Sequence, residues 1–406
     1  MDQKILGKKL LKARGNCGLN QHEVEKALDL PQKAITRIES GERLVSTLEL
    51  AKLAALYHQP IADFFTESDT EEDLFLVLHR LEPGIEKNRK INEEVARCIH
   101  ICREGISIKK LLNRYSQQQM RSYSSSFPEN TIKAIEEGEK AAKDERRCLG
   151  IGYAPIGDIA ELFSSQGLWC AGISLLPEMS GLFLQHASLG RVILVNASHA
   201  PTRQRFSYAH EYAHALFDHA SRVLISNATN SSDLIEKRAN AFAAALLLPS
   251  EGIEEMVRNL GKGHSSRNFQ SVFDVARESS FDAEERQVVQ KITPQDVAII
   301  ARHFKVSYQA TVYRLHSLRY LNAKEKEVLL ALEDEGKQYL ALIGFLPESE
   351  KSEKSSSSKR ELKTYISQLI IDAYRQEAIS RGRFFELCKL IELPAEKLLS
   401  IAENIS

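Results

Sequence analysis

Two histidines and a glutamate in the segment 210–214 are spaced for metal chemistry. His210 and His214 are four residues apart, so in a helix both imidazoles lie on one face, a single turn apart. Both could then bind one Zn²⁺ ion, and Glu211 between them could accept a proton from a water molecule at the metal. The pattern HExxH therefore predicts the centre of a zinc-dependent hydrolase.

A third protein ligand is expected on the following helix. The segment 233–248 has the pattern of a helix and is ended by Pro249. Glu236 lies 22 residues after His214, which leaves enough chain for a turn and a helix that runs back. Asn240, one turn beyond Glu236 on the same face, could orient a ligand through a hydrogen bond. Three protein ligands would leave one position open, as catalytic zinc requires.

Short strands are expected before this helix pair. The segments 181–185 and 191–195 have the pattern of two strands joined by a turn through Gly190, and 167–173 reads as a further strand. An edge strand beside an active-site helix could bind an extended peptide by adding it to the sheet. This layout suits a peptidase.

The stretches RQRFSYAHEYAHALFDH (203–219) and EKRANAFAAALLLP (236–249) resemble the ImmA/IrrE family of metallopeptidases. The resemblance covers about 145–250 and, more loosely, the helices that follow. It implies a zincin-like α+β core, and a DNA-binding repressor as the substrate, cleaved to release its operon. It places His210, His214 and Glu236 at the metal. It gives Glu211 the role of general base. Zn²⁺ suits two imidazoles and a carboxylate, and Mn²⁺ is a possible alternative.

Three positions near the motif need separate interpretation. Tyr212 and Ala213 stand where family members often have an aliphatic residue and glycine, but neither is a ligand, so activity is expected to survive. His219 comes one residue too early for the third histidine of a metzincin, and Leu216 replaces the glycine of that pattern. We expect His219 to contact a metal ligand or the substrate oxyanion. Alternatively, it is simply a histidine at the C-terminus of a helix, where the helix dipole favours a positive charge.

The N-terminal part is rich in helix signals. Residues 1–65 read as five short helices. Asn20 and Ser46 are good N-caps. The pattern predicts a helix over 32–40, ended by Gly41.

The stretches LNQHEVEKALDLPQKAITRIESGER (19–43) and LELAKLAALYHQPIADFF (48–65) resemble the helix-turn-helix domains of the Cro and lambda-repressor type. The resemblance implies binding to double-stranded operator DNA and a structural pair between Arg14 and Glu39. A homodimer on a two-fold site is expected. The residues expected to face base edges are Gln32, Lys33, Thr36 and Arg37. Gln21 is expected to contact a phosphate, and Lys8, Lys9 and Lys12 could add further contacts to the DNA backbone.

Composition bounds the rest of the chain. Its 406 residues suffice for two or three domains, and a net charge of −1 excludes a global attraction to nucleic acid or membranes. The six cysteines, with no membrane-length apolar stretch and no signal peptide, predict a cytoplasmic protein with reduced thiols. Cys98 and Cys102 flank His100, yet two buried thiols are a better interpretation than a metal site, because no partner pair follows.

The predicted fold class is mainly α with a small β-sheet, with an all-α five-helix domain at the N-terminus and a helical C-terminal region. A helix-turn-helix-like segment over 293–321 is expected to pack beside the peptidase core rather than read DNA. A low-complexity stretch at 116–126 is expected to be a loop or linker, and a natural place for a cut that separates DNA reader from peptidase. The expected division is 1–67 for DNA binding, 68–144 as connector, 145–250 for the peptidase core, 251–345 as a helical region, 346–361 as a charged, serine-rich linker and 362–406 as terminal helices.

Two functions are compatible with these patterns. The first is a DNA-bound regulator whose zinc peptidase cleaves a repressor, itself or a partner, in response to stress or a mobile element. The second is a transcription factor whose zinc domain senses a ligand or partner without proteolysis, or an antitoxin-like regulator.

Overall fold

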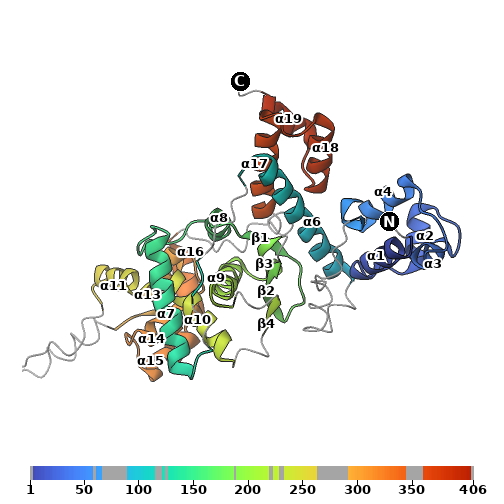
Figure 1. Cartoon of the computed structure of the whole chain (residues 1–406). Coiled ribbons are helices and arrows are strands. Elements are labelled where there is room, and N and C mark those ends of the chain that lie inside the picture. Colours follow the sequence, from blue (N-terminus) through green and yellow to red (C-terminus); the bar gives the residue numbers. More distant parts are fainter. Residues whose placement is uncertain are drawn as a thin grey trace, which may run out of the picture.

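A computed structural model describes residues 3–57, 61–65, 89–114, 121–123, 127–186, 189–218, 223–227, 233–262, 291–343 and 360–403. It shows a mainly helical chain around one small sheet, as the sequence predicts (Figure 1). Within these ranges, no helix combines the length and the apolar character needed to cross a bilayer.

The N-terminal domain consists of five short helical segments with a common core. Capping boxes start two of them, at Asn20 and Ser46, as their sequences indicate. The prediction is wrong at the third helix: Lys33 adopts a left-handed conformation (φ 63°), so this helix begins only at Ala34. The segments are α1 (Gln3–Asn16), α2 (Gln21–Leu28), α3 (Ala34–Glu39), α4 (Thr47–Leu56) and the 3₁₀-helix η1 (Ile61–Phe64).

The sheet has four strands in the order β1-β3-β2-β4. β3 runs parallel to β1 and antiparallel to β2, and β4 pairs antiparallel with the other edge of β2. The three predicted strands are present, whereas the sequence pattern gave no indication of β4. Gly190, where the turn was predicted, is the first residue of β3 and has a positive φ of 75°, and residues 187–188 of the connection lie outside the described residues. The bounds are β1 (Trp169–Ile173), β2 (Met179–His186), β3 (Gly190–Asn196) and β4 (Val223–Asn227).

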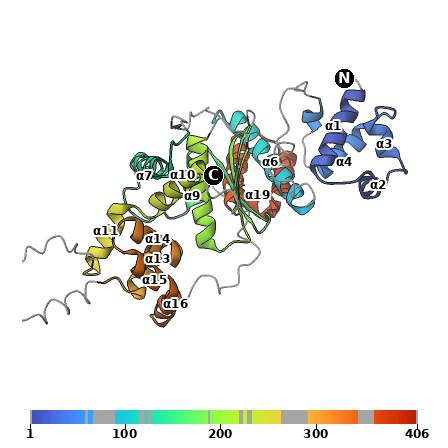
Figure 2. The same cartoon turned by 90° about the horizontal axis from the view of Figure 1, so that it is seen from below.

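Helices cover both faces of this sheet (Figure 2). Alternate strand residues point to opposite faces, so each strand supplies apolar side chains to two cores. The first face packs on α8 (Ile159–Ser165) and α9 (Pro201–Phe217) through Cys170, Phe183, Ile193 and Val195. Behind them, α10 (Leu234–Leu247) packs on α9, and α7 (Thr131–Cys148) packs on α10. The second face packs on α6 (Arg89–Leu111) and α17 (Arg360–Arg375) through Trp169, Ala171, Leu182, Leu184, Val192 and Leu194. The sheet is therefore the middle layer between two sets of helices.

The helix-turn-helix-like segment forms α13 and α14 and packs on the first set of helices, as expected. Arg314 of α14 donates to the carbonyl oxygen of Leu248 at 3.1 Å, and Phe304 of α13 contacts Gly252. The helices of this region are α11 (Ser250–Asn259), α13 (Pro294–Phe304), α14 (Tyr308–Ser317), α15 (Ala323–Ala331) and α16 (Glu333–Leu342). The chain then reaches α17, followed by α18 (Arg381–Leu390) and α19 (Ala395–Glu403).

Candidate functional site

The structure brings three possible metal ligands together between α9 and α10. His210 Nε2 lies 3.0 Å from Glu236 Oε2 and 3.1 Å from His214 Nε2, and His214 Nε2 lies 3.5 Å from Glu236 Oε1. All three side chains are buried. Their ligand atoms lie within 4.8 Å of one another, and no other group of three such side chains occurs in the described part of the chain. The predicted spacing thus corresponds to real proximity.

The outer nitrogen of each imidazole faces an oxygen acceptor. His210 Nδ1 lies 3.0 Å from Asn240 Oδ1, and His214 Nδ1 lies 2.9 Å from Asp218 Oδ2. Each Nδ1 therefore carries the proton, and each Nε2 turns a lone pair toward the other and toward Glu236. Converging acceptors repel one another unless a cation lies between them. Two imidazole nitrogens and one carboxylate match the donor set of a catalytic Zn²⁺ site, so the residues fit the ion.

Burial and the neighbouring carboxylates act in opposite directions on the protonation of His214. Complete burial of the ring disfavours the charged form, but the hydrogen bond to Asp218 and the carboxylates of Glu211 and Glu236 outweigh burial and raise the pKa of His214. The site therefore holds an excess of negative charge, which also favours a bound cation.

Glu211 lies between α9 and the sheet. Its side chain is completely buried, and its carboxylate lies against Gly181 of β2. A Cβ atom at Gly181 would come within 2.7 Å of Glu211 Oε1, so only glycine leaves room for this carboxylate. The strand thus determines where the carboxylate of the HExxH motif can lie.

Two buried charges behind the ligands were not predicted. Asp218 ends α9 and contacts His214, while Arg238 of α10 donates to Asp218 Oδ1 at 2.8 Å. The spacing of four residues between His214 and Asp218 could have revealed the first of them. Asn240 contacts His210, as the sequence predicted, through its Oδ1 atom. His219, the other predicted neighbour of the site, lies outside the described residues.

The predicted DNA-reading residues lie on one exposed surface, but not all on the helix. Gln32 and Lys33 belong to the turn before α3, and Thr36 and Arg37 are on α3 itself; all four are exposed. The correction follows from the left-handed backbone at Lys33, which delays the helix by two residues.

Side chains behind this surface form one hydrogen-bonded network. Arg14 pairs with Glu39 through two bonds, of 2.6 and 3.0 Å, as the resemblance implied. Gln21 donates to Glu39 Oε2 at 2.7 Å and accepts from the Thr36 hydroxyl at 2.8 Å. Gln21 is thus fixed by α3 rather than free to rotate. Lys8 and Lys12 of α1 are exposed and Lys9 is half-buried.

Cys98 and Cys102 of α6 are buried thiols, as the sequence favoured. Burial raises the pKa of the Cys102 thiol. Neither takes part in a cluster of possible metal ligands within the described ranges.

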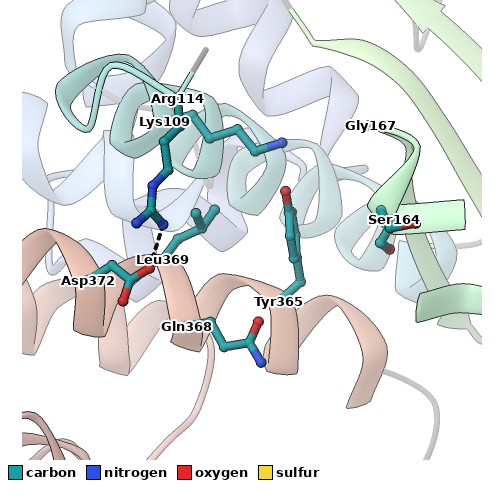
Figure 3. A pocket seen from close by; sticks show the side chains of 9 residues that line it. Lys109, Arg114, Ser164, Gly167, Tyr365, Gln368, Leu369 and Asp372 are labelled. Carbon is teal, nitrogen blue, oxygen red and sulfur yellow. Dashed lines mark hydrogen bonds and ion pairs between the residues drawn. The ribbon is translucent and has the colours of Figure 1, made fainter. Parts of the chain in front are cut away.

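A cavity of about 250 Å³ is lined by residues of α6, α17 and the C-terminal end of α8, and none of the three possible metal ligands lines it. Figure 3 shows Lys109 of α6 and Arg114, three residues after that helix, facing Tyr365 and Asp372 of α17, with Arg114 bound to Asp372. The Lys109 ammonium lies 4.9 Å from the centre of the Tyr365 ring. None of these side chains reaches the histidine cluster, so the cavity is not part of the candidate metal site.

Two family models match the chain. Residues 171–316 match the peptidase family described as the IrrE N-terminal-like domain, and residues 10–64 match the helix-turn-helix family. The chain therefore carries an N-terminal helix-turn-helix domain and a metallopeptidase-type domain of the ImmA/IrrE kind. The resemblance inferred from the two motifs is confirmed.

Two curated relatives are both called radiation response metalloprotease IrrE. The protein of Deinococcus deserti is 32% identical over 119 residues, and that of Deinococcus radiodurans is 35% identical over 103 residues. These matches cover 25% and 22% of this chain, and 42% and 31% of the relatives. The chain thus matches less than half the length of either relative.

Proposed function

We propose that this protein is a DNA-binding regulator with a zinc-dependent peptidase that cleaves a repressor, itself or a partner, in response to stress or a mobile element. The convergence of His210, His214 and Glu236 carries the proposal. The family match and the metalloprotease relatives support the same reaction class. Zn²⁺ is the proposed ion, and Mn²⁺ is the alternative for the same ligands.

The chemistry divides between the ion and the chain. Bound Zn²⁺ would act as a Lewis acid that polarises the scissile carbonyl and makes water more acidic. Glu211 would take the proton of the attacking water and pass it to the leaving amine. Asn240 accepts from His210 Nδ1 and so leaves Nε2 free to bind an ion that His214 and Glu236 would share. Burial of these groups excludes bulk water and strengthens each electrostatic interaction.

DNA binding is assigned to the surface around α3. Gln32, Lys33, Thr36 and Arg37 would meet base edges in the major groove, and Gln21 would contact phosphate. Because one such domain gives few contacts, we propose a homodimer on a two-fold operator. We propose the same division of the chain into segments, which end at residues 67, 144, 250, 345 and 361. We also propose a cytoplasmic location, where operator DNA is accessible.

The test compares the wild-type chain with Glu211→Gln, which keeps the metal ligands and removes the proton acceptor. Both proteins are incubated with Zn²⁺ or Mn²⁺, with and without single-stranded DNA, and with each helix-turn-helix protein encoded beside the gene. Intact mass is followed over time. We expect fragments from the wild type alone.

Two outcomes contradict the proposal. Equal cleavage by Glu211→Gln removes the assigned general base. A wild type that binds zinc but cuts neither itself nor any of those proteins supports a zinc-containing sensor instead, and normal regulation of the operon by Glu211→Gln would support that alternative independently.

A further inference from the structure

Asp218 joins the histidine cluster to the end of α9. It is the residue that follows the last helical residue, and its backbone N–H donates to the carbonyl oxygen of His214. Its Oδ2 atom accepts from His214 Nδ1 at 2.9 Å, and the residue is buried. One carboxylate oxygen of Asp218 is thereby committed to a possible metal ligand.

The other carboxylate oxygen is committed to α10. Arg238 donates from Nη2 to Asp218 Oδ1 at 2.8 Å, and the side chain of Arg238 is only 2% exposed. Its guanidinium lies 4.3 Å from the centre of the Phe217 ring, and Nη1 lies 3.3 Å from Glu137 Oε2 on α7. Arg238 is two residues after Glu236, so the helix that supplies the carboxylate ligand also holds the support of His214.

We propose that Asp218 and Arg238 are positioning residues that together select the metal-binding tautomer of His214. The inference rests on the proposed zinc site and adds to it. A guanidinium has donors only, so Arg238 requires an acceptor on the facing atom of residue 218. Aspartate meets this demand with one oxygen and accepts the Nδ1 proton of His214 with the other. His214 Nε2 then has its lone pair directed at His210 and Glu236.

An asparagine at this position would reverse the tautomer. Arg238 would attract the amide oxygen of Asp218→Asn, which turns the amide NH₂ toward His214 Nδ1. That nitrogen would then have to accept, and its proton would move to Nε2, where the metal should bind. The effect depends on Arg238: without the guanidinium, the amide can turn its oxygen to His214 and restore the metal-binding tautomer.

The test is a double-mutant cycle on the full-length chain with zinc affinity as the readout. The proteins are wild type, Asp218→Asn, Arg238→Met and the double variant. Methionine keeps an apolar stem over Phe217 and removes all donors. The zinc dissociation constant is measured by competition with a chromophoric chelator. The visible spectrum of bound Co²⁺ shows whether both imidazoles remain ligands.

We expect Asp218→Asn to weaken zinc binding about 10–100-fold. Arg238→Met should stay within about threefold of wild type, because Asp218 keeps its bond to His214. The double variant should bind zinc about tenfold more tightly than Asp218→Asn alone, because the two sites share one network. A merely structural role of the pair would not produce this rescue.

Two further variants make the result specific. Asp218→Ala should weaken zinc binding with or without Arg238→Met, because alanine has no amide to turn; it also replaces Asp218→Asn in the test if that variant does not fold. Asp334→Asn, at a side chain 91% exposed, should change nothing.

Normal zinc affinity in Asp218→Asn, or a double variant that binds no better than Asp218→Asn, overturns the inference. If Asp218→Ala is used instead of Asp218→Asn, the inference is overturned by normal zinc affinity of Asp218→Ala. It is also overturned if adding Arg238→Met restores zinc binding to Asp218→Ala. A wild type that does not bind zinc contradicts the proposed function itself, so the two failures are distinct.

Discussion

Gly181 offers a direct test of how the sheet places the carboxylate of Glu211. In Gly181→Ala the new Cβ would lie 2.7 Å from Glu211 Oε1 and 3.0 Å from Leu194 O. Ordinary contact begins near 3.4 Å, so the carboxylate has to move by about 0.7 Å. Glu211 is completely buried, so this movement displaces its neighbours as well.

Overpacking of this kind costs about 1–3 kcal/mol of unfolding free energy. Gly→Ala in a strand without a clash would instead stabilise by up to about 1 kcal/mol, through the unfolded chain. A lower free energy of unfolding in Gly181→Ala than in the wild type therefore identifies a steric clash at this position. A misplacement approaching 1 Å would also lower any peptidase rate by up to about a hundredfold.

Urea unfolding of metal-free protein measures the effect, in a cycle with Glu211→Ala. Removing the carboxylate relieves the contact at 2.7 Å and leaves only the Leu194 carbonyl, so most of the loss should disappear. We expect a coupling free energy of at least about 1 kcal/mol. Gly157→Ala is the matched control, because a Cβ there meets no atom within 4 Å. Coupling below about 0.5 kcal/mol would refute the placement of Glu211 against β2.

Three further predictions concern the metal, DNA and pH. Saturating Zn²⁺ at a hundredfold excess over its Kd should stabilise the wild type by about 2.7 kcal/mol, and His214→Ala should abolish this shift in thermal unfolding; equal shifts would contradict the metal site. Arg37→Ala should weaken binding to a selected operator by about 1–3 kcal/mol in fluorescence anisotropy while leaving the melting temperature unchanged; unaltered affinity would exclude Arg37 from the interface. Lys363 and then Arg97 lower the pKa of Glu392 to about 2, so this carboxylate stabilises the fold above its unfolded pKa of 4.5, and the contribution is lost as pH falls toward 2. Because the side chain of Glu392 is 51% exposed, Glu392→Gln should cost at most about 1 kcal/mol at pH 6 and nothing near pH 2; a constant difference across this range would refute the pairing.

The metal cluster was predictable because local periodicity encodes it. Two histidines four residues apart share a helix face, and Glu236 begins the next strongly patterned helix. The one step that the sequence leaves open is whether the second helix returns to the first, and the buried contact between Glu236 and His210 shows that it does. Asn240 follows from the same helical spacing.

Features that depend on backbone conformation or on distant partners were not predictable. The left-handed conformation of Lys33 is rare for a residue with a side chain, so the helix pattern was extended two residues too far. β4 is only five residues long and lies far along the chain from β2, its partner in the sheet. The burial of Arg238 was not predictable because Asp218, which accepts from it, lies 20 residues earlier, directly after α9.

The position of α6 changes how a regulatory cut could separate the two domains. The stretch 116–126 was expected to be a linker between DNA reader and peptidase. Of this stretch the structure describes residues 121–123, and there the backbone N–H of Tyr123 donates to Leu216 O of α9 at 3.0 Å, while its ring stacks on Phe217.

The helix before that stretch belongs to the peptidase side of the molecule. α6 packs on β1 and α17, and apolar side chains of α6 such as Ile99 and Ile106 are buried in the core on the second face of the sheet. A cut within 115–120 would leave α6 attached to the helix-turn-helix domain. The fragments would then remain joined through this buried interface. Release of the DNA-binding domain therefore requires a cut before Arg89, or loss of α6 from the sheet, which would expose the apolar side of β1 to water.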